Sequence, residues 1–508
     1  MITGKNYIGK TLKANGDKSH KTINPKLNVQ NPTAFYEATS DEVDEAVELA
    51  WNAFKIYRKI SGVKRAAFLN AIADEILALD QELLDSYMTE SGLPEARAMG
   101  ERGRTVSQLR SFADLVENDD WREITIDEAI PERTPIPKDD LRRTLIPIGP
   151  VVVFAASNFP LAFSTAGGDT ASALAAGCPV IVKAHAMHSG TAELVASAII
   201  KAAERTGMPN GVFSNIMGRG RTVGVKLVKH DKVKAVGFTG SISGGRALFD
   251  IAAQRKEPIP VFAEMGSINP VVITARAIEN RSEAVAAAFA GSITTGAGQF
   301  CTKPGLLLTV ESAKTQQFIK DLAKKTVAID LQYMLHPDIK REFVENVNII
   351  SSQAGAEIVG KVEEAIDVNA APSQIATVSG KEFLVNPKLH LEAFGPFALV
   401  VRAKNQEELI EIINGLDGQL TGTIIAEKED YSDLYNIIDA LENRVGRIIF
   451  NGVPTGVEVC PSMQHGGPYP ASTDSRFTAV GTNSIKRWVR PVSYQSFPNE
   501  LLPSALKR

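Results

Sequence analysis

The pattern of apolar and polar positions changes along the chain near residue 150. Before this point, apolar side chains recur at helical spacing, for example at Val43, Ala46 and Val47. Ser40 is followed by two acidic residues and is the expected N-cap of the first helix, and Ser61 is the expected N-cap of the second. This part of the chain is therefore predicted to supply packing helices rather than chemistry.

From Val151 onward, short apolar runs alternate with helical segments. The runs VVVFAAS, PVIVKA, VFSNIMG and KAVGFTG have the length of buried strands, and helical segments such as 191–205 lie between them. Strands that alternate with crossover helices predict a parallel, doubly wound sheet. A second strand-helix series begins after Pro260 and continues to GRIIFNG, so a second α/β domain is expected.

Two charged stretches with strand-like composition lie outside both series, at residues 121–143 and 485–498. Neither stretch can bury a core by itself. Each is therefore expected to pair with another element of the chain or with another subunit.

The composition narrows the classes of function. The 508 residues carry 55 Lys and Arg against 59 Asp and Glu, a formal net charge of −4, which argues against a nucleic-acid partner. No segment approaches the roughly 20 consecutive apolar residues of a membrane helix, and the polar first residues do not resemble a signal peptide. Three cysteines are too few for a disulfide framework, so a cytoplasmic location is expected.

Three polar residues stand at positions that suggest catalysis. Cys301 follows Gly296 and Gly298 in a loop suited to a nucleophile, although a cysteine is more often a small buried hydrophobe. Glu264 interrupts the apolar run VFAEMG, where a carboxylate is either a general base or a structural acceptor of backbone N–H groups. Asn158 follows a predicted strand and is either a donor to an oxyanion or a turn residue.

A second group of residues suggests a cofactor site. Lys183 ends PVIVK at the C-terminal edge of a predicted strand, where doubly wound sheets bind ligands. Gly240 and Ser241 follow KAVGFT and open a helix whose N–H groups can face a phosphate. His185 and His188 have the spacing of a metal pair, but no further ligand cluster accompanies them, so no metal site is expected.

Taken together, these residues resemble the aldehyde dehydrogenase superfamily over nearly the whole chain. The motifs that carry the resemblance are SNFP with Asn158, PVIVK with Lys183, GFTGS with Ser241, EMGS with Glu264, QFC with Cys301, and EAFGP with Glu392 and Phe394. The order and spacing of the motifs match the family, and this combination outweighs the structural alternatives for the single residues.

The resemblance implies an α/β fold with three parts and a homodimeric or homotetrameric assembly. The parts are a Rossmann-like cofactor-binding domain (1–123 and 145–264), an α/β catalytic domain (265–460) and a small β oligomerisation flap (124–144 and 480–508). The flap would extend the sheet of a neighbouring subunit.

The resemblance also implies a role for each site residue. Cys301 would attack an aldehyde, Asn158 would stabilise the oxyanion, and Glu264 would activate the water that hydrolyses the thioester. The implied cofactor contacts are Lys183 with the adenosine ribose, Gly240 and Ser241 with the pyrophosphate, and Glu392 and Phe394 with the nicotinamide end.

The residue three positions after the lysine bears on the choice of cofactor. Family members that prefer NAD often have a glutamate there, whereas this chain has Ala186. The loss of a carboxylate relieves repulsion of a 2′-phosphate, and His185, Arg219 or Arg221 offers a donor or a positive charge nearby. NADP is therefore expected to be accepted, with NAD also used.

Within the superfamily, segments 154–185 and 451–473 are most similar to α-ketoglutaric semialdehyde dehydrogenases, which oxidise 2,5-dioxopentanoate to 2-oxoglutarate. The residues expected to line the substrate site are Phe159, Phe163, Phe300 and His465. None of the four is expected to hold a carboxylate as Arg or Lys would, which leaves Arg104 and Arg110 as candidates. Because the aromatic lining also fits a long-chain aldehyde, an NADP-dependent fatty aldehyde dehydrogenase is the alternative.

Three other classes of protein share parts of this pattern. CoA-acylating aldehyde dehydrogenases generally lack a base equivalent to Glu264, and non-enzymatic family members usually lose the nucleophile or the base. A Cys/His hydrolase would need a histidine paired with Cys301, and His465 is the candidate for that pairing.

Overall fold

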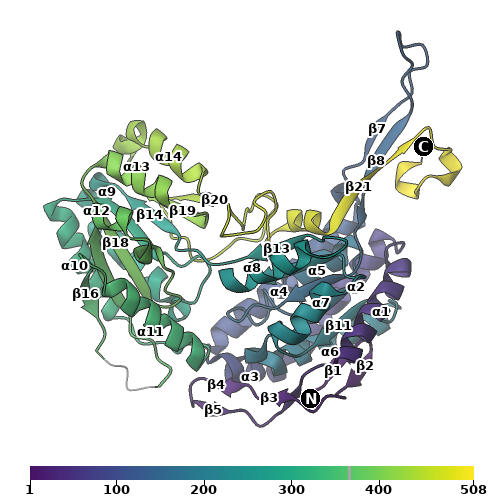
Figure 1. The fold of residues 1–508 in the computed structure, drawn as a ribbon, viewed down its shortest axis with the longest axis horizontal. Helices are drawn as coiled ribbons and strands as arrows, with labels where there is room; N and C mark the ends of the chain where they lie inside the picture. Colours follow the sequence, from purple (N-terminus) through teal and green to yellow (C-terminus); the bar gives the residue numbers. More distant parts are fainter. Residues whose placement is uncertain (364–367, 508) are drawn as a thin grey trace.

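A computed structural model describes residues 1–363 and 368–507. The chain forms two large α/β bodies, each with a seven-stranded sheet, and a small three-stranded sheet that projects from one of them (Figure 1). The first sheet has the order β13-β12-β9-β10-β11-β1-β2. Its strands are β13 (Val261–Glu264), β12 (Ala235–Thr239), β9 (Val151–Phe154), β10 (Val180–Lys183), β11 (Phe213–Ile216), β1 (Asn6–Ile8) and β2 (Thr11–Lys13).

Five consecutive strands of this sheet, from β13 to β11, are parallel, which confirms the doubly wound pattern predicted from the apolar runs. The antiparallel strands β1 and β2 extend its edge, so the helical prediction was wrong for the segment before α1, which forms short strands instead. Alternate residues of β9 face opposite layers, because Val151 and Val153 join one hydrophobic core and Val152 and Phe154 join another. Burial on both faces explains why these strands have continuous apolar sequences.

Helices cover both faces of the first sheet. They are α1 (Ser40–Tyr57), α2 (Gly62–Ala78), α3 (Asp80–Ser91), α4 (Glu95–Glu117), α5 (Gly168–Ala176), α6 (Ser189–Arg205), α7 (Val225–Lys229) and α8 (Ile242–Ala253). Ser61 caps α2 as predicted. The prediction for α1 was wrong by one residue, because Thr39 is the N-cap and forms a capping box with Glu42.

The second sheet has the order β16-β17-β18-β15-β14-β19-β20. Its strands are β16 (Glu357–Lys361), β17 (Gln374–Ser379), β18 (Phe397–Ala403), β15 (Leu306–Val310), β14 (Pro270–Ile273), β19 (Gln419–Ile425) and β20 (Val445–Phe450). The packed helices are α9 (Ala275–Thr294), α10 (Ala313–Val327), α11 (Pro337–Ser351), α12 (Gly380–Val385), α13 (Gln406–Gly415) and α14 (Tyr435–Glu442). All its pairings are parallel except that of β16 with β17.

The third sheet joins the two charged stretches. Strand β8 (Leu141–Pro147) lies between β7 (Thr125–Asp127) and β21 (Val489–Gln495), with both pairings antiparallel. The predicted pairing with another element is therefore made within the chain. Over the described residues, every helix is too short or too polar to cross a membrane.

Candidate active site

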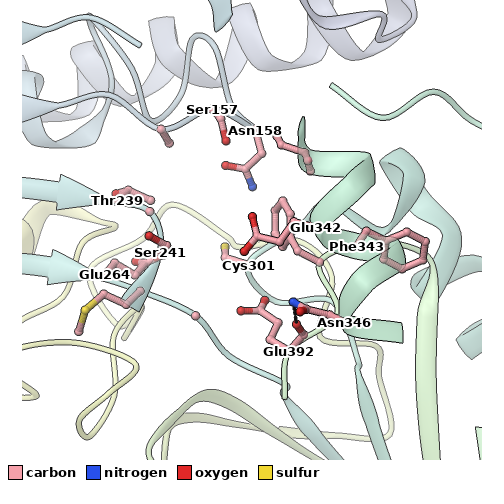
Figure 2. A pocket seen from close by; sticks show the side chains of 16 residues that line it. Ser157, Asn158, Thr239, Ser241, Glu264, Cys301, Glu342, Phe343, Asn346 and Glu392 are labelled. Carbon is pink, nitrogen blue, oxygen red and sulfur yellow. Dashed lines mark hydrogen bonds between the residues drawn. The ribbon is translucent and has the colours of Figure 1, made fainter. Parts of the chain in front are cut away.

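Cys301 lies in the second body, in the loop between α9 and β15. Three consecutive residues before it adopt left-handed backbone conformations, with φ of 60° at Gly296, 55° at Ala297 and 67° at Gly298. A Cβ on Gly298 would lie 2.3 Å from the carbonyl carbon of Gly395, so only glycine fits there. This tight turn directs the half-buried Cys301 into the cavity between the two bodies (Figure 2).

Asn269 fixes the backbone around the cysteine. Its fully buried amide Nδ2 donates to the carbonyl oxygens of Cys301 at 2.8 Å and of Lys303 at 2.9 Å. The residue itself has a φ of 50°, a left-handed conformation that asparagine tolerates better than most side chains. Sequence reasoning missed Asn269, because a polar residue before a strand carries no sign of which distant loop it will contact.

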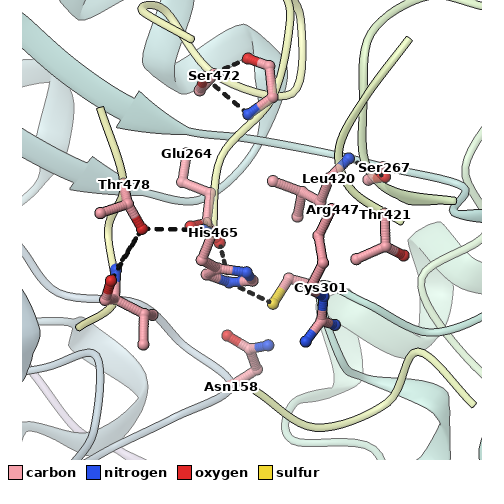
Figure 3. A network of polar contacts seen from close by, with 12 residues as sticks. Asn158, Glu264, Ser267, Cys301, Leu420, Thr421, Arg447, His465, Ser472 and Thr478 are labelled. Carbon is pink, nitrogen blue, oxygen red and sulfur yellow. Dashed lines mark hydrogen bonds and ion pairs between the residues drawn. The ribbon is translucent and has the colours of Figure 1, made fainter. Parts of the chain in front are cut away.

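Glu264 and His465 lie beside the cysteine thiol. Glu264 ends β13, and its side chain is 4% exposed. The imidazole Nε2 of His465 lies 3.0 Å from Oε1 of Glu264 and 3.5 Å from Sγ of Cys301 (Figure 3). Burial alone would lower the pKa of His465, but the negative charges of Glu264 and Cys301 raise it to about 10. The two acidic groups on either side of the imidazole therefore favour its protonated form.

The loop that carries His465 has its own anchors. The backbone N–H of His465 donates to Oγ1 of Thr478 at 2.9 Å, and the N–H of Ala479 donates to the carbonyl of His465 at 2.8 Å. His465 had been expected among the residues that line the substrate site. The structure places it against the nucleophile, with a side chain only 1% exposed, and its ring centroid 6.0 Å from that of Phe163.

Asn158 faces the same cavity from the first body. It follows β9, and its Nδ2 donates to the carbonyl oxygen of Gln299 at 3.0 Å. Because a carboxamide nitrogen has two hydrogens, this bond orients the side chain and leaves one hydrogen for another acceptor. The chemistry of the donor thus fits an oxyanion formed at Cys301.

Three phenylalanines form an aromatic cluster next to the cysteine. The ring centroid of Phe159 lies 5.2 Å from that of Phe163 and 5.3 Å from that of Phe300. The guanidinium of Arg97 lies 4.4 Å from the centroid of Phe300, and that of Arg104 lies 5.3 Å from the centroid of Phe163. The sequence-predicted aromatic residues are therefore brought together, with two arginines of α4 packed on them.

Arg104 differs from the other candidate arginine of that helix. Its Nε and Nη2 atoms are buried without a hydrogen-bond partner in the described part of the chain. Burial lowers the pKa of Arg104, while the negative charges of Cys301, Glu101 and Glu264 raise it. Arg110 is exposed and forms an ion pair with Asp74 at 3.4 Å, so it lies outside this environment.

The cavity in front of Cys301 is bounded by both bodies (Figure 2). The sequence-predicted cofactor residues Gly240, Ser241, Glu392 and Phe394 all line it. Ser241 caps α8, and its Oγ accepts from the N–H of Gly244 at 3.2 Å, which leaves the N-terminus of this helix facing the cavity. Sequence reasoning missed four lining residues of α11, namely Ile339, Glu342, Phe343 and Asn346.

A buried lysine anchors the loop that carries Glu392. The Nζ of Lys303 donates to the carbonyl oxygens of Ala393 at 2.9 Å and of Phe397 at 2.8 Å. Burial lowers the pKa of Lys303, and burial raises the pKa of Glu392 against the opposing charge of Lys303. The side chain of Lys303 therefore fixes the position of the loop that contains Glu392.

A second cavity, in the first body, holds the residues predicted for the adenosine end. Lys183, His185, Arg219 and Arg221 line it. Burial lowers the pKa of Lys183 to about 8, although the carboxylate of Glu37 opposes the change. Burial also lowers the pKa of His185 well below its ordinary value, so this side chain offers hydrogen bonds but no positive charge.

Glu37 enters this second cavity from the N-terminal segment and was missed by sequence reasoning. Its Oε1 lies 3.5 Å from Nε of Arg219, whose side chain is 83% exposed. A carboxylate therefore lies beside Lys183 although residue 186 is alanine, and it comes from a part of the chain 146 positions away from the lysine.

The two cavities fit a dinucleotide. The capped N-terminus of α8 presents N–H groups suited to a pyrophosphate, and Lys183 offers a cation at the C-terminal edge of the sheet. A Cβ on Gly266 would lie 2.5 Å from Oε2 of Glu392, so glycine keeps open the space in which that carboxylate lies.

His185 and His188, the two histidines with the spacing of a metal pair, contact other groups and each other. Nε2 of His188 is 2.7 Å from the carbonyl oxygen of Ala156, and its ring stacks with that of His185. Among the described residues, the one group of three that could hold a metal is Glu264, Cys301 and His465. Of the other cysteines, Cys178 is fully buried, as expected of a packing thiol, and Cys460 is half-buried.

Comparison with known proteins places the chain among dehydrogenases. The model of the aldehyde dehydrogenase family matches residues 12–472. The α-ketoglutaric semialdehyde dehydrogenase 2 of Azospirillum brasilense is 46% identical, over 100% of this chain and 97% of that protein. The α-ketoglutaric semialdehyde dehydrogenase of Acinetobacter baylyi is 43% identical, over 99% and 96%. The structure of aldehyde dehydrogenase KauB from Pseudomonas aeruginosa is similar in fold, with a TM-score of 0.84 at 21% identity over 97% of each chain.

Proposed function

Since the chain belongs to the aldehyde dehydrogenase family, we propose that it oxidises 2,5-dioxopentanoate to 2-oxoglutarate with a nicotinamide cofactor. Two relatives with 46% and 43% identity over nearly the full length, both α-ketoglutaric semialdehyde dehydrogenases, support this substrate. The observation that carries the chemistry is the placement of Cys301, Glu264 and Asn158 around one cavity.

In the proposed reaction, Sγ of Cys301 adds to the aldehyde carbon and forms a thiohemiacetal. The free hydrogen on Nδ2 of Asn158 donates to the resulting oxyanion, which lowers the energy of the tetrahedral species. A bound nicotinamide cofactor would supply the acceptor for the hydride that leaves this carbon. Glu264 then removes a proton from water, and the resulting hydroxide attacks the thioester and releases the carboxylate product.

The cofactor would be held along the line of the two cavities. Lys183 would bind the adenosine ribose, Gly240 and Ser241 the pyrophosphate, and Glu392 and Phe394 the nicotinamide end. The family uses NAD(P), and we propose that this chain accepts NADP and also uses NAD. The positive charges of Arg219 and Arg221 support binding of a 2′-phosphate.

The carboxylate of the substrate would bind to Arg104. Two of the guanidinium nitrogens of this residue are buried and unpaired, and such groups cost about 1–3 kcal/mol each unless a ligand satisfies them. The residue packs on Phe163 of the aromatic cluster, and the charge of Cys301 acts on its pKa. An acidic aldehyde with its carbonyl at Cys301 would supply the missing partner.

The test compares kcat/KM for 2,5-dioxopentanoate with that for decanal, at saturating NADP. We expect a ratio well above one. Arg104→Leu should lower the ratio by about tenfold or more, because a charge-assisted pair is worth about 1.5–3 kcal/mol. Arg110→Leu, on the same helix but in an exposed ion pair, is the matched control and should leave the ratio unchanged.

A fatty aldehyde is the second candidate substrate, and the cluster of Phe159, Phe163 and Phe300 favours it. A ratio well below one would assign the enzyme to this class and keep the chemistry. Cys301→Ala should abolish turnover of both aldehydes, because no acyl carrier remains. Steady-state turnover in that variant would contradict the assigned nucleophile.

We also propose that residues 124–144 and 480–508 join subunits in a dimer or tetramer. The cofactor-binding domain would consist of residues 1–123 and 145–264, and the catalytic domain of residues 265–460. Strand β7 has an exposed apolar side chain at Ile126, and the connection from β7 to β8 has two more at Ile130 and Ile136, which supports burial against another copy. Analytical ultracentrifugation of the full chain and of Ile126→Lys tests this assembly. A monomeric wild type would contradict it.

A further inference from the structure

His465 contacts two groups of the proposed reaction through a single nitrogen atom. Nε2 lies 3.5 Å from Sγ of Cys301 and 3.0 Å from Oε1 of Glu264, as Figure 3 shows. The other ring nitrogen, Nδ1, is buried without a hydrogen-bond partner in the described ranges. The close polar contacts of the ring are therefore made on the side that faces the thiol.

We propose that His465 is a further catalytic residue, which takes the proton of the Cys301 thiol. In this step the Sγ–H bond breaks and an Nε2–H bond forms, so that the resting nucleophile is a thiolate paired with an imidazolium. No electron leaves the site, and the proton remains on the protein. The inference rests on the proposed role of Cys301 as the nucleophile.

The contact with Glu264 explains why the proton stays on the imidazole. The ring can take the thiol proton only in the neutral form that is protonated at Nδ1, and this form directs the Nε2 lone pair at a carboxylate oxygen 3.0 Å away. Protonation of Nε2 replaces that repulsion with a charge-assisted contact. Glu264 thus stabilises the imidazolium, and the imidazolium stabilises the thiolate. This is the arrangement by which a neighbouring cation makes a cysteine more nucleophilic.

Other charged groups also face the thiol. The charge of Cys301 raises the pKa of Arg104 on α4 and of Arg447 on β20, although burial is the larger effect on both and lowers their pKa. Both guanidinium groups are cationic and favour the thiolate. The charged groups around Cys301 in the described ranges therefore include cations from His465, Arg104 and Arg447. They also include the carboxyl groups of Glu264, Glu342 and Glu392, which line the same cavity.

Glu264 keeps an oxygen for its later role. Its Oε2 is buried without a hydrogen-bond partner over the residues described, so this atom can accept a proton from water while Oε1 faces His465. One oxygen of Glu264 therefore contacts His465, and the other is available to accept a proton from water. Once Cys301 carries an acyl group it has no negative charge, and His465 retains Glu264 as its only anionic contact.

The experiment measures the rate of Cys301 alkylation by iodoacetamide against pH, in the full-length wild type and in His465→Asn. In the wild type we expect rapid alkylation to persist at about pH 6.5, below the ordinary thiol pKa of about 8.5. In His465→Asn the midpoint should move up toward the ordinary value. Alkylation at about pH 6.5 should then fall by about tenfold or more, and the two rates should converge above about pH 9.5.

Two controls separate this role from a structural one. His390→Asn changes a histidine that stacks on Phe383, remote from the thiol, and should leave the profile unchanged. A purely structural role of His465 would lower the rate by the same factor at every pH. That result, or a profile for His465→Asn that superimposes on the wild type, would overturn the proposal.

A second measurement does not depend on the folding of the histidine variant. The difference in ultraviolet absorbance between the wild type and Cys301→Ala reports the thiolate directly. We expect a thiolate signal at neutral pH, and its absence would overturn the proposal. Turnover retained by Cys301→Ala would instead refute the proposed function, so the two failures are distinguishable.

Discussion

The carboxylate of Glu37 lies 3.5 Å from the guanidinium of Arg219, at the cavity that holds Lys183. The pair combines a group that repels a 2′-phosphate with one that attracts it. Arg219 is mostly exposed and free to turn toward a phosphate, whereas the Glu37 side chain is only 13% exposed. The balance between these two residues should therefore determine the preference between NADP and NAD.

Arg219→Ala should lower kcat/KM for NADP by about tenfold, because one charge-assisted contact with the phosphate is lost. The value for NAD should change little. Glu37→Gln should act in the opposite direction and favour NADP. Steady-state kinetics with both cofactors measure the ratio, with Arg246→Ala as a control, since Arg246 pairs with Asp250 on the exposed face of α8. Equal losses for both cofactors in Arg219→Ala would contradict the assignment.

Cofactor binding should weaken as the pH rises through about 8. Burial lowers the pKa of Lys183 to about 8, so its ammonium loses its charge above that pH. KM for NADP, measured between about pH 6.5 and 9.5, should increase on the alkaline side. Lys183→Arg should flatten this dependence, because a guanidinium stays protonated. Glu37→Gln removes the charge that raises the pKa of Lys183, so the break should move to lower pH.

Glu264→Gln should separate the two halves of the reaction. The glutamine keeps the shape of the side chain but cannot remove a proton from water, so deacylation should slow by about 10²–10⁴-fold. Stopped-flow absorbance should show a burst of reduced cofactor followed by a slow steady state. If the burst also disappears, Glu264 acts before hydride transfer, and its contact with His465 is the structural route for that effect.

Asn269→Gly should impair both stability and reactivity. Glycine tolerates the φ of 50° but removes the bonds to the carbonyl oxygens of Cys301 and Lys303. We expect a loss of about 2 kcal/mol or more in the free energy of unfolding, measured in urea, and slower alkylation of Cys301. Asn451→Gly is a matched control, because Asn451 also has a left-handed φ, of 54°, but lies at the end of β20. Unchanged alkylation in Asn269→Gly would show that the clamp is dispensable.

The apolar runs alone predicted the parallel strands of both sheets, because fully buried strands must be apolar on both faces, but they did not predict the edge strands β1 and β2. The runs that became β9, β10, β12 and β13 were recognisable for this reason. The sequence also marked Cys301 and Glu264, since a thiol in a glycine-rich loop and a carboxylate at the end of an apolar run are chemically unusual. The motifs around these residues then indicated the family.

Which distant groups meet depends on the packing of the folded chain. His465 lies 164 positions from Cys301, and Glu37 belongs to a segment with no motif of its own. Local pattern is set by neighbours along the chain, whereas these contacts depend on how two sheets and their loops pack together. The charge pairs made by His465 and Glu37 depend on distances between atoms of remote segments, and folding sets those distances.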